Sequence, residues 1–157
     1  MRTALRGRPD DGSVHGLMMA LLAPNTPAQV QMETNFIEAA RRAGVQHLVQ
    51  FSGLGADIDS PARISRCHAM VERTLEESGI PFTHLRPNTF MQNILGAAPA
   101  IASRGSLEQP MNDLTVSLVD VRDIAAVAAT VLTEPGHIGN ITDVHQTDRQ
   151  IVHRLLE

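Results

Sequence analysis

Tyrosine, tryptophan and lysine are all absent from this 157-residue chain. Every one of its 13 basic residues is therefore an arginine. These absences exclude any reaction mechanism that needs a phenol or an amine side chain. The single cysteine, Cys67, excludes a disulfide within the chain. One unpaired cysteine is compatible with the reducing cytoplasm, where we expect the protein to reside.

Charge and hydropathy give no support to several other classes of function. The net charge is −4 and the basic residues form no stripe, so direct binding to nucleic acid is not indicated. No segment reaches the roughly 18 apolar residues of a membrane-spanning helix, so no membrane contact is expected. The seven histidines never fall three or four residues apart in one expected helix, and no metal site is predicted.

Apolar runs alternate with helical patterns from residue 16 onward, which predicts one domain over 16–157. The polar segment before it, 1–15, contains two glycines and a proline and is expected to be a flexible arm. Strands are predicted at 16–23, 45–51, 82–85, 114–119 and 140–144. Helices are predicted at about 27–43, 62–78, 89–97, 120–134 and 147–156. This alternation predicts an α/β fold with a parallel sheet and right-handed crossovers.

Apolar stripes indicate which face of each helix is buried. Thr26-Pro27 and Ser60-Pro61 are both typical of a capping residue followed by proline in the first turn. The first helix is predicted to bury Met32, Phe36, Ala39 and Ala43, with Val30, Ile37 and Ala40 beside them. The second is predicted to bury Ile64, Cys67, Val71 and Leu75, while Arg73 and Glu77 pair outside.

The stretch from Pro81 to Asn93 is where we expect a site. Phe82–Leu85 is predicted to be a strand that Arg86-Pro87 ends, because proline has no N–H to give a sheet. Asn88 or Thr89 then caps a helix. The carboxyl ends of parallel strands share one edge, so one cleft is expected to be lined by Pro24, Asn25, Ser52, Gly53 and Pro87 to Phe90. Two alternatives stay open: these are ordinary strand-ending turns, and Arg86 either contacts a ligand or merely ends a strand.

Several segments, in this order and spacing, resemble the NmrA-like family of atypical short-chain dehydrogenase/reductase relatives. They are Ala39–Val49, Phe51–Ala56, Glu72–Thr83, Leu85–Pro87, Phe90–Asn93 and Val119–Ala125. The resemblance covers about residues 16–140. It implies a Rossmann fold that binds NAD or NADP. It also implies that the expected cleft is the nicotinamide side of the cofactor pocket, to which Pro24, Asn25, Ser52, Gly53, His68, Pro87, Asn88, Thr89 and Phe90 contribute.

The chain departs from the family pattern in ways that bear on function. A Rossmann protein holds the pyrophosphate on a G-x-x-G-x-x-G loop at a helix N-terminus, and the nearest pattern here, Gly53-x-Gly55, follows the wrong strand. The resemblance therefore implies a chain that lacks the first, phosphate-binding half of the domain. The Tyr-x-x-x-Lys positions of the superfamily are occupied by Ile64 and His68. His68 can still contact a nicotinamide ribose, and no catalytic residue is assigned.

Three functions remain open. The first is a truncated NmrA-like protein that binds dinucleotide weakly or not at all on its own. The second is an NAD(P)H-dependent reductase of the quinone or isoflavone-reductase type. The third is a non-catalytic redox-sensing or transcription co-regulator module. In addition, a sheet that starts at Leu17–Leu22 exposes an apolar edge, which predicts a homodimer or a partner chain at that strand.

Overall fold

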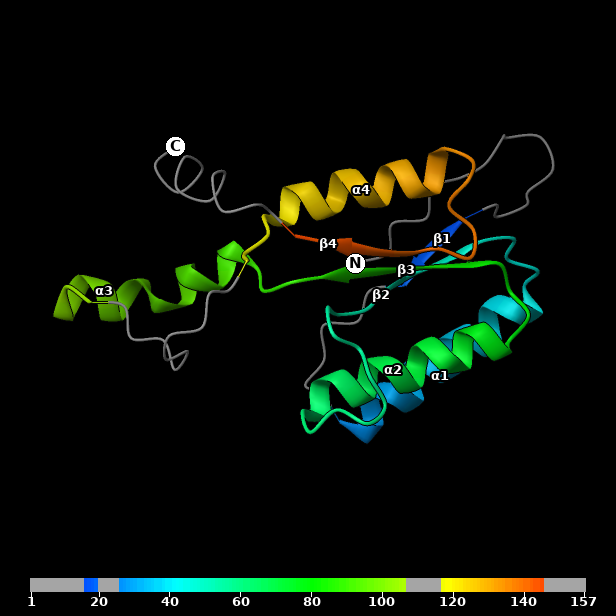
Figure 1. Cartoon of the computed structure of the whole chain (residues 1–157), viewed down its shortest axis with the longest axis horizontal. Helices are drawn as coiled ribbons and strands as arrows, with labels where there is room; N and C mark the ends of the chain where they lie inside the picture. Colours follow the sequence, from blue (N-terminus) through cyan, green and yellow to red (C-terminus); the bar gives the residue numbers. More distant parts are fainter. Residues whose placement is uncertain (1–15, 20–25, 107–116, 146–157) are drawn as a thin grey trace.

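A computed structural model describes residues 16–19, 26–106 and 117–145 as a parallel sheet with helices on both faces (Figure 1). The four strands are β1 (Leu17–Met19), β2 (Leu48–Phe51), β3 (Phe82–Pro87) and β4 (Ile141–Val144). They lie in the order β1-β2-β3-β4, and every neighbouring pair is parallel. The predicted fold class, a parallel α/β sheet of the Rossmann type, is confirmed. The predicted arm at 1–15 and helix at 147–156 lie outside the described residues.

Helices cover the two faces of the sheet unequally. Helices α1 (Pro27–Arg42) and α2 (Arg63–Glu77) pack against each other on one face, and α4 (Val121–Thr133) covers the other (Figure 1). The chain steps across the sheet in the same direction at every connection. The β3-to-β4 connection passes over the opposite face and therefore has the opposite hand to the other two. The expectation of right-handed crossovers throughout is wrong, because the handedness rule applies to compact βαβ units and this connection is long.

Alternating side chains along the strands build a core on each face of the sheet. Leu48 and Phe82 pack with α1 and α2, whereas Val49 and Leu85 pack with α4. Burial of an aliphatic side chain of this size contributes roughly 1.5–3 kcal/mol. The two sets of contacts therefore hold β2 and β3 from both sides of the sheet.

The buried face of α1 differs from the predicted one. Thr26 caps the helix as expected, since its Oγ1 accepts a hydrogen bond from the backbone N–H of Gln29. The buried residues are Gln29, Glu33, Ile37 and Ala40. Met32 is 45% exposed, and Ala39 and Ala43 are also exposed. The prediction failed because two of the four buried positions carry polar side chains, which a search for an apolar stripe passes over.

Helix α2 begins later than expected. The Ser60-Pro61 pair does not cap it: the helix starts at Arg63 after Ala62, which has no side chain to accept a hydrogen bond. Ser60 Oγ instead accepts from the N–H of Ala62 in the preceding turn. Cys67, Val71 and Leu75 are buried as predicted, but Ile64 is 47% exposed. The predicted pair of Arg73 and Glu77 is confirmed, with 2.8 Å between Arg73 Nε and Glu77 Oε1.

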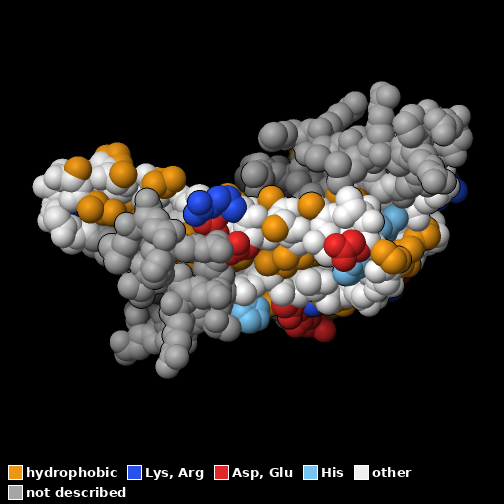
Figure 2. Space-filling model, turned by 90° about the horizontal axis from the view of Figure 1, so that it is seen from above, with side chains coloured by type: hydrophobic (Ala, Val, Ile, Leu, Met, Phe, Trp, Pro, Cys, Tyr) orange, Lys and Arg blue, Asp and Glu red, His pale blue; other side chains and the backbone are white. Residues whose placement is uncertain are grey.

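The segment after β3 also corrects the prediction. β3 continues through Arg86 to Pro87, and neither Asn88 nor Thr89 caps a helix. The 3₁₀-helix η1 (Met91–Ala97) occupies most of the helix predicted at about 89–97, and α3 (Ala98–Arg104) follows, where no element was predicted. These two elements project from the body of the molecule (Figure 1). Hydrophobic side chains gather on this projection (Figure 2), including Leu95, which is 71% exposed.

Two of the predicted strands lie only partly within the described residues. Of the strand predicted at 114–119, only the last residues are described, and Val119 forms an isolated parallel bridge with Phe90. Of the strand predicted at 16–23, the structure describes only residues 16–19. Within the described ranges, none of the helices is both long and apolar enough to pass through a bilayer.

Candidate functional site

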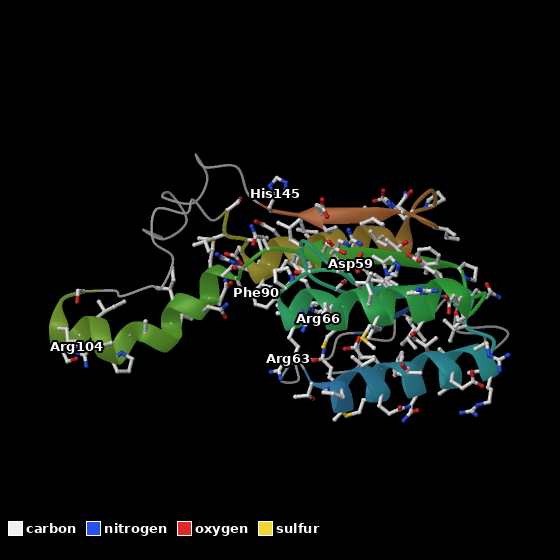
Figure 3. All side chains as sticks on the ribbon, turned by 60° about the horizontal axis from the view of Figure 1, so that its bottom comes forward. Asp59, Arg63, Arg66, Phe90, Arg104 and His145 are labelled. Atoms are coloured by element: carbon white, nitrogen blue, oxygen red, sulfur yellow. The ribbon has the colours of Figure 1, made fainter. Side chains whose placement is uncertain are left out.

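A pocket of about 420 Å³ lies at the carboxyl edge of β2 and β3. Its walls are the turn after β2, the turn after β3, the first turns of α2 and one side chain of α1. Figure 3 shows Phe90 at this edge, near the end of α2 that carries Arg63 and Arg66. The lining residues are Gln29, Phe51, Ser52, Gly53, Leu54, Ile64, Ser65, His68, Pro87, Asn88, Thr89, Phe90 and Asn93.

Backbone hydrogen bonds hold the turn after β2 against the end of β3. The N–H of Ser52 donates to the carbonyl of Leu85 at 2.8 Å, and the N–H of Leu54 donates to the carbonyl of Pro87 at 3.0 Å. Pro87 can end the strand here because its carbonyl, which proline retains, is the group that the turn uses. The pocket wall is therefore an extension of the sheet rather than a free loop.

Gly53 in this turn allows the close approach of His68. A Cβ atom added at Gly53 would lie 3.0 Å from His68 Cδ2 and 3.1 Å from His68 Nε2. Such a contact is tighter than most real Cβ contacts, so a side chain at this position would shift the imidazole ring by a few tenths of an ångström. The absence of a side chain at Gly53 therefore lets the ring of His68 lie close against the turn.

The turn after β3 is held on both sides. The N–H of Asn88 donates to the carbonyl of Val144 at 3.1 Å, and Asn88 Oδ1 accepts from the N–H of Thr89 at 2.8 Å. The carbonyl of Thr89 accepts from the N–H of Val119 at 3.0 Å. The ring of Phe90 packs edge-on against Phe51, with 5.9 Å between centroids. Such pairs contribute roughly 0.5–1.5 kcal/mol beyond their burial, and this pair gives the pocket an aromatic wall.

His68 is the only titratable side chain among the described residues that line the pocket. It makes no hydrogen bond to another described residue. Burial lowers its pKa, and the nearby carboxylate of Glu72 partly offsets this effect. The neutral form of His68 is therefore favoured relative to an ordinary histidine.

An ion pair lies behind the pocket, between α2 and β3. Arg86 Nε donates to Glu72 Oε1 at 2.8 Å, and Arg86 Nη2 donates to Glu72 Oε2 at 2.6 Å. Burial alone raises the pKa of Glu72, but the two hydrogen bonds from Arg86, together with the nearby Ser52 hydroxyl and the charge of His84, lower it overall. Arg86 does not line the pocket. The structure thus favours the second alternative for Arg86, a residue that serves the fold.

Several buried polar atoms on this face lack hydrogen-bond partners among the described residues. They are Gln29 Oε1, both side-chain polar atoms of Gln50, Ser52 Oγ and His84 Nδ1. The Ser52 hydroxyl lies close enough to Glu72 to affect its pKa, yet no partner meets hydrogen-bonding geometry. Buried polar groups are normally satisfied by protein, water or ligand. Ser52 and Gln29 line the pocket, so a polar ligand there fits this pattern.

Seven residues predicted from the sequence come together in this pocket: Ser52, Gly53, His68, Pro87, Asn88, Thr89 and Phe90. Pro24 and Asn25 lie outside the described residues. Whether the seven bind a cofactor stays a prediction. The described part of the chain contains no cluster of three or more side chains able to hold a metal ion.

Other lining residues were missed by the sequence argument. Ile64 lies four residues before His68 on the same side of α2, so helical spacing from His68 could have found it. Gln29 lies in the first turn of α1, which starts at this edge of the sheet. Asn93 has no comparable signal, because its position depends on how η1 leaves the sheet.

Comparison with known proteins places these features in one family. The model of the NmrA-like family matches residues 14–151. An NAD(P)H azoreductase of Xenophilus azovorans is 44% identical over 117 residues, which are 74% of this chain and 41% of that protein. The chain thus spans less than half the length of this curated relative.

Solved structures agree with this placement. The NADPH-dependent quinone oxidoreductase of Escherichia coli, solved with NADPH, superposes with a TM-score of 0.75 at 31% identity, over 84% of this chain and 46% of that one. The triphenylmethane reductase of a Citrobacter species, solved with NADP(H), gives a TM-score of 0.73 at 25% identity, over 85% and 46%.

Proposed function

The chain belongs to the NmrA-like family, and from this we propose that it forms the nicotinamide side of an NAD(P)H-dependent reductase of quinone-like acceptors. The observation that carries the proposal is the pocket itself. Residues from three separate segments, predicted from the sequence as the nicotinamide side, line one cavity at the carboxyl edge of a parallel sheet. In open α/β sheets this edge is where ligands bind.

The chemistry of the pocket fits flat rings with polar edges. Its volume of about 420 Å³ lies toward the low end of small-molecule sites, which hold about 300–1,000 Å³. Phe51 and Phe90 offer an apolar wall, while Asn88 and Asn93 offer amide groups. NAD(P)H, when bound, supplies two electrons together with one hydrogen. The residues of this chain orient the reacting rings and exclude water.

The missing tyrosine is compatible with this reaction. Transfer from a nicotinamide to a quinone depends on how the two rings are positioned, so the protein needs to orient them more than to supply a phenol. The relatives that carry reductase names in the comparisons support the choice of a reductase over the co-regulator alternative. We further propose that the protein works in the cytoplasm, where its one cysteine stays reduced.

The affinity for dinucleotide is a separate part of the proposal. The described residues contain no glycine-rich phosphate loop, and such a loop normally provides much of the binding to a pyrophosphate. We therefore expect this chain alone to bind NADPH weakly. A titration that follows NADPH fluorescence should show no saturation at micromolar concentrations, and micromolar affinity would contradict this part.

The reductase proposal is tested by following NADPH oxidation at 340 nm with a panel of quinones. We expect slow but enzyme-dependent oxidation at millimolar NADPH, and we expect Phe90→Ala to reduce it at least tenfold because the aromatic wall is lost. Ile138→Ser, a change at a side chain that is 60% exposed, serves as the matched control. If no quinone accelerates NADPH oxidation above the rate without protein, the proposal is wrong.

A further inference from the structure

We propose that His68 donates a proton to the acceptor while the acceptor is reduced in the pocket. This inference rests on the proposed reductase function and adds a catalytic residue to it. The resemblance assigns position 68 only a contact with a sugar of the cofactor. The geometry of the pocket points instead to acid–base chemistry at this imidazole.

Among the described residues that line the pocket, His68 carries the one side chain that can act as an acid near neutral pH. The other described side chains that line it are apolar, hydroxyl or amide groups. Hydroxyl and amide groups do not release a proton near neutral pH, whereas histidine titrates in this range. A quinone oxygen that gains electrons becomes basic and needs a proton. Among the lining residues that the structure describes, His68 is the one that can provide it.

The ring of His68 lies at the wall of the pocket and is not hydrogen-bonded to any described residue. The Cδ2–Nε2 edge of His68 lies against the open side of Gly53, in the pocket wall. The ring makes no hydrogen bond to another described residue, so none of those residues competes for its proton. A general acid must reach the atom that it protonates within about 2.6–3.2 Å. His68 lines the cavity, so an acceptor bound there would lie beside its ring.

The charges around the ring also bear on its protonation. Burial lowers the pKa of His68, and Glu72, one turn further along α2, partly offsets this by favouring the protonated imidazole. Arg86 of β3 pairs with Glu72 through two hydrogen bonds and holds that carboxylate in place. In the turn after β2, Ser52 and Gly53 carry no charge, and α1 contributes the neutral Gln29 to the pocket. Among the described residues that line the pocket, no other side chain is charged.

The step balances in atoms and electrons. A bound NAD(P)H would supply a hydride, that is, two electrons and one hydrogen. The N–H bond of protonated His68 breaks, its electron pair stays on the imidazole, and the proton goes to the quinone oxygen. With that hydride the quinone would become a hydroquinone, and His68 is left neutral. Water at the pocket mouth then returns a proton to the imidazole, which restores the starting state.

A first experiment needs neither cofactor nor turnover. 4-Nitrophenol is added to the protein as a phenolate analogue of the reduced acceptor, and the histidine Cε1–H signals are titrated by NMR. The signal of His68 is identified by its loss in His68→Gln. If the ring donates to the bound oxygen, saturation with the probe should raise the pKa of His68 by about one unit, a tenfold coupling, because binding and protonation are reciprocal. Binding without this rise, or no binding, would overturn the inference.

A second experiment uses the pH dependence of quinone reduction. In the native chain kcat/KM should fall as pH rises through the pKa of His68, because the acid form is lost. His68→Gln should lose this dependence and be slower by roughly 10²-fold at pH 6, the lower range for a general acid. His137→Gln, in the turn before β4, is the matched control. Equal profiles for native protein and His68→Gln would refute the role of His68 while the reductase function stands; no turnover in the native chain would refute the reductase function itself.

Discussion

Arg86 of β3 and Glu72 of α2 face each other in a two-bond ion pair, with Arg86 Nη2 2.6 Å from Glu72 Oε2 and Arg86 Nε 2.8 Å from Glu72 Oε1. The Glu72 carboxylate is almost fully buried, whereas the Arg86 side chain is 21% exposed. This pair ties the helix that carries His68 to the strand that ends at the pocket. The position of His68 therefore depends on it.

Breaking this pair should destabilise the protein. We expect Arg86→Met to lower the free energy of unfolding by about 2 kcal/mol, somewhat less than for a fully buried pair, because Glu72 is left buried without its cation. Urea unfolding followed by circular dichroism measures this change. The double variant Arg86→Met with Glu72→Leu should recover part of the loss. If the double variant is as unstable as the sum of both single variants, the two side chains do not act as a pair.

A second prediction concerns acid stability and Asp120. This buried carboxylate accepts hydrogen bonds from the backbone and side chain of Arg122 and from Gln92, which together hold its pKa well below the usual range. Because its pKa is lower in the folded than in the unfolded state, the stabilisation is present above about pH 4 and is lost as pH falls further.

The matching variant is Asp120→Asn, which keeps a side chain able to cap α4. We expect it to be less stable than the native chain at pH 7 and to lose less stability between pH 5 and pH 3. Thermal unfolding at several pH values measures both effects. An equal slope for the two proteins over this range would show that Asp120 does not contribute to the acid sensitivity.

A third prediction compares two effects of replacing a glycine: a steric contact at Gly53 and a strained positive φ at Gly55. Gly53→Ala should displace the His68 ring, because the new Cβ would lie 3.0 Å from it. The pocket should change while the fold persists. Gly55→Ala is the control: Gly55 has a φ of 74° and no atom near the added Cβ, so it should cost about 1 kcal/mol of stability through strain. Its His68 signal should stay at the native chemical shift.

NMR of the His68 ring and urea unfolding give the two readouts. If Gly53→Ala leaves the His68 signal unchanged, then the close contact between the two residues does not determine the ring position. If Gly55→Ala moves that signal as far as Gly53→Ala does, the effect is a general property of the turn.

The fourth prediction is self-association through β1, which is an edge of the sheet in the described residues. The N–H of Leu17 donates to the carbonyl of His47, which directly precedes β2. In a parallel strand the next N–H, that of Met18, points away from β2. Light scattering after size exclusion should therefore show a mass above the monomer at micromolar concentrations.

Proline variants test which edge is responsible. Met18→Pro removes an outward N–H and should shift the protein toward monomer, since edge strands tolerate proline. Leu17→Pro removes a hydrogen bond to β2 and should destabilise the fold instead. A native chain that is monomeric at all concentrations would contradict the prediction.

Much of the architecture follows from local patterns. The cap at Thr26 begins α1 because its hydroxyl satisfies a backbone N–H of the first turn, an interaction that involves residues only three apart. The parallel sheet follows from strands that alternate with helices. Convergence of Ser52 and Gly53 with Pro87 to Phe90 could also be predicted, because parallel strands place their carboxyl ends at one edge whatever their side chains are.

Long-range packing decided what those patterns left open. Spacing shows that a helix has a buried face, but it does not show which face when Gln29 and Glu33 occupy it. The approach of His68 to Gly53 depends on the angle between α2 and β2, and the exposure of Ile64 depends on the open pocket beside it.

The sequence by itself determined the order of strands and helices and the edge at which a site forms, because hydrophobic periodicity and parallel pairing are enough for both. Only the tertiary structure decided that α4 lies on the opposite face and that Arg86 pairs with Glu72 instead of lining the pocket. The physical reason is that these features depend on contacts between residues far apart in the chain. The side chain of Arg86 pairs with Glu72, and the ring of His68 lies against Gly53.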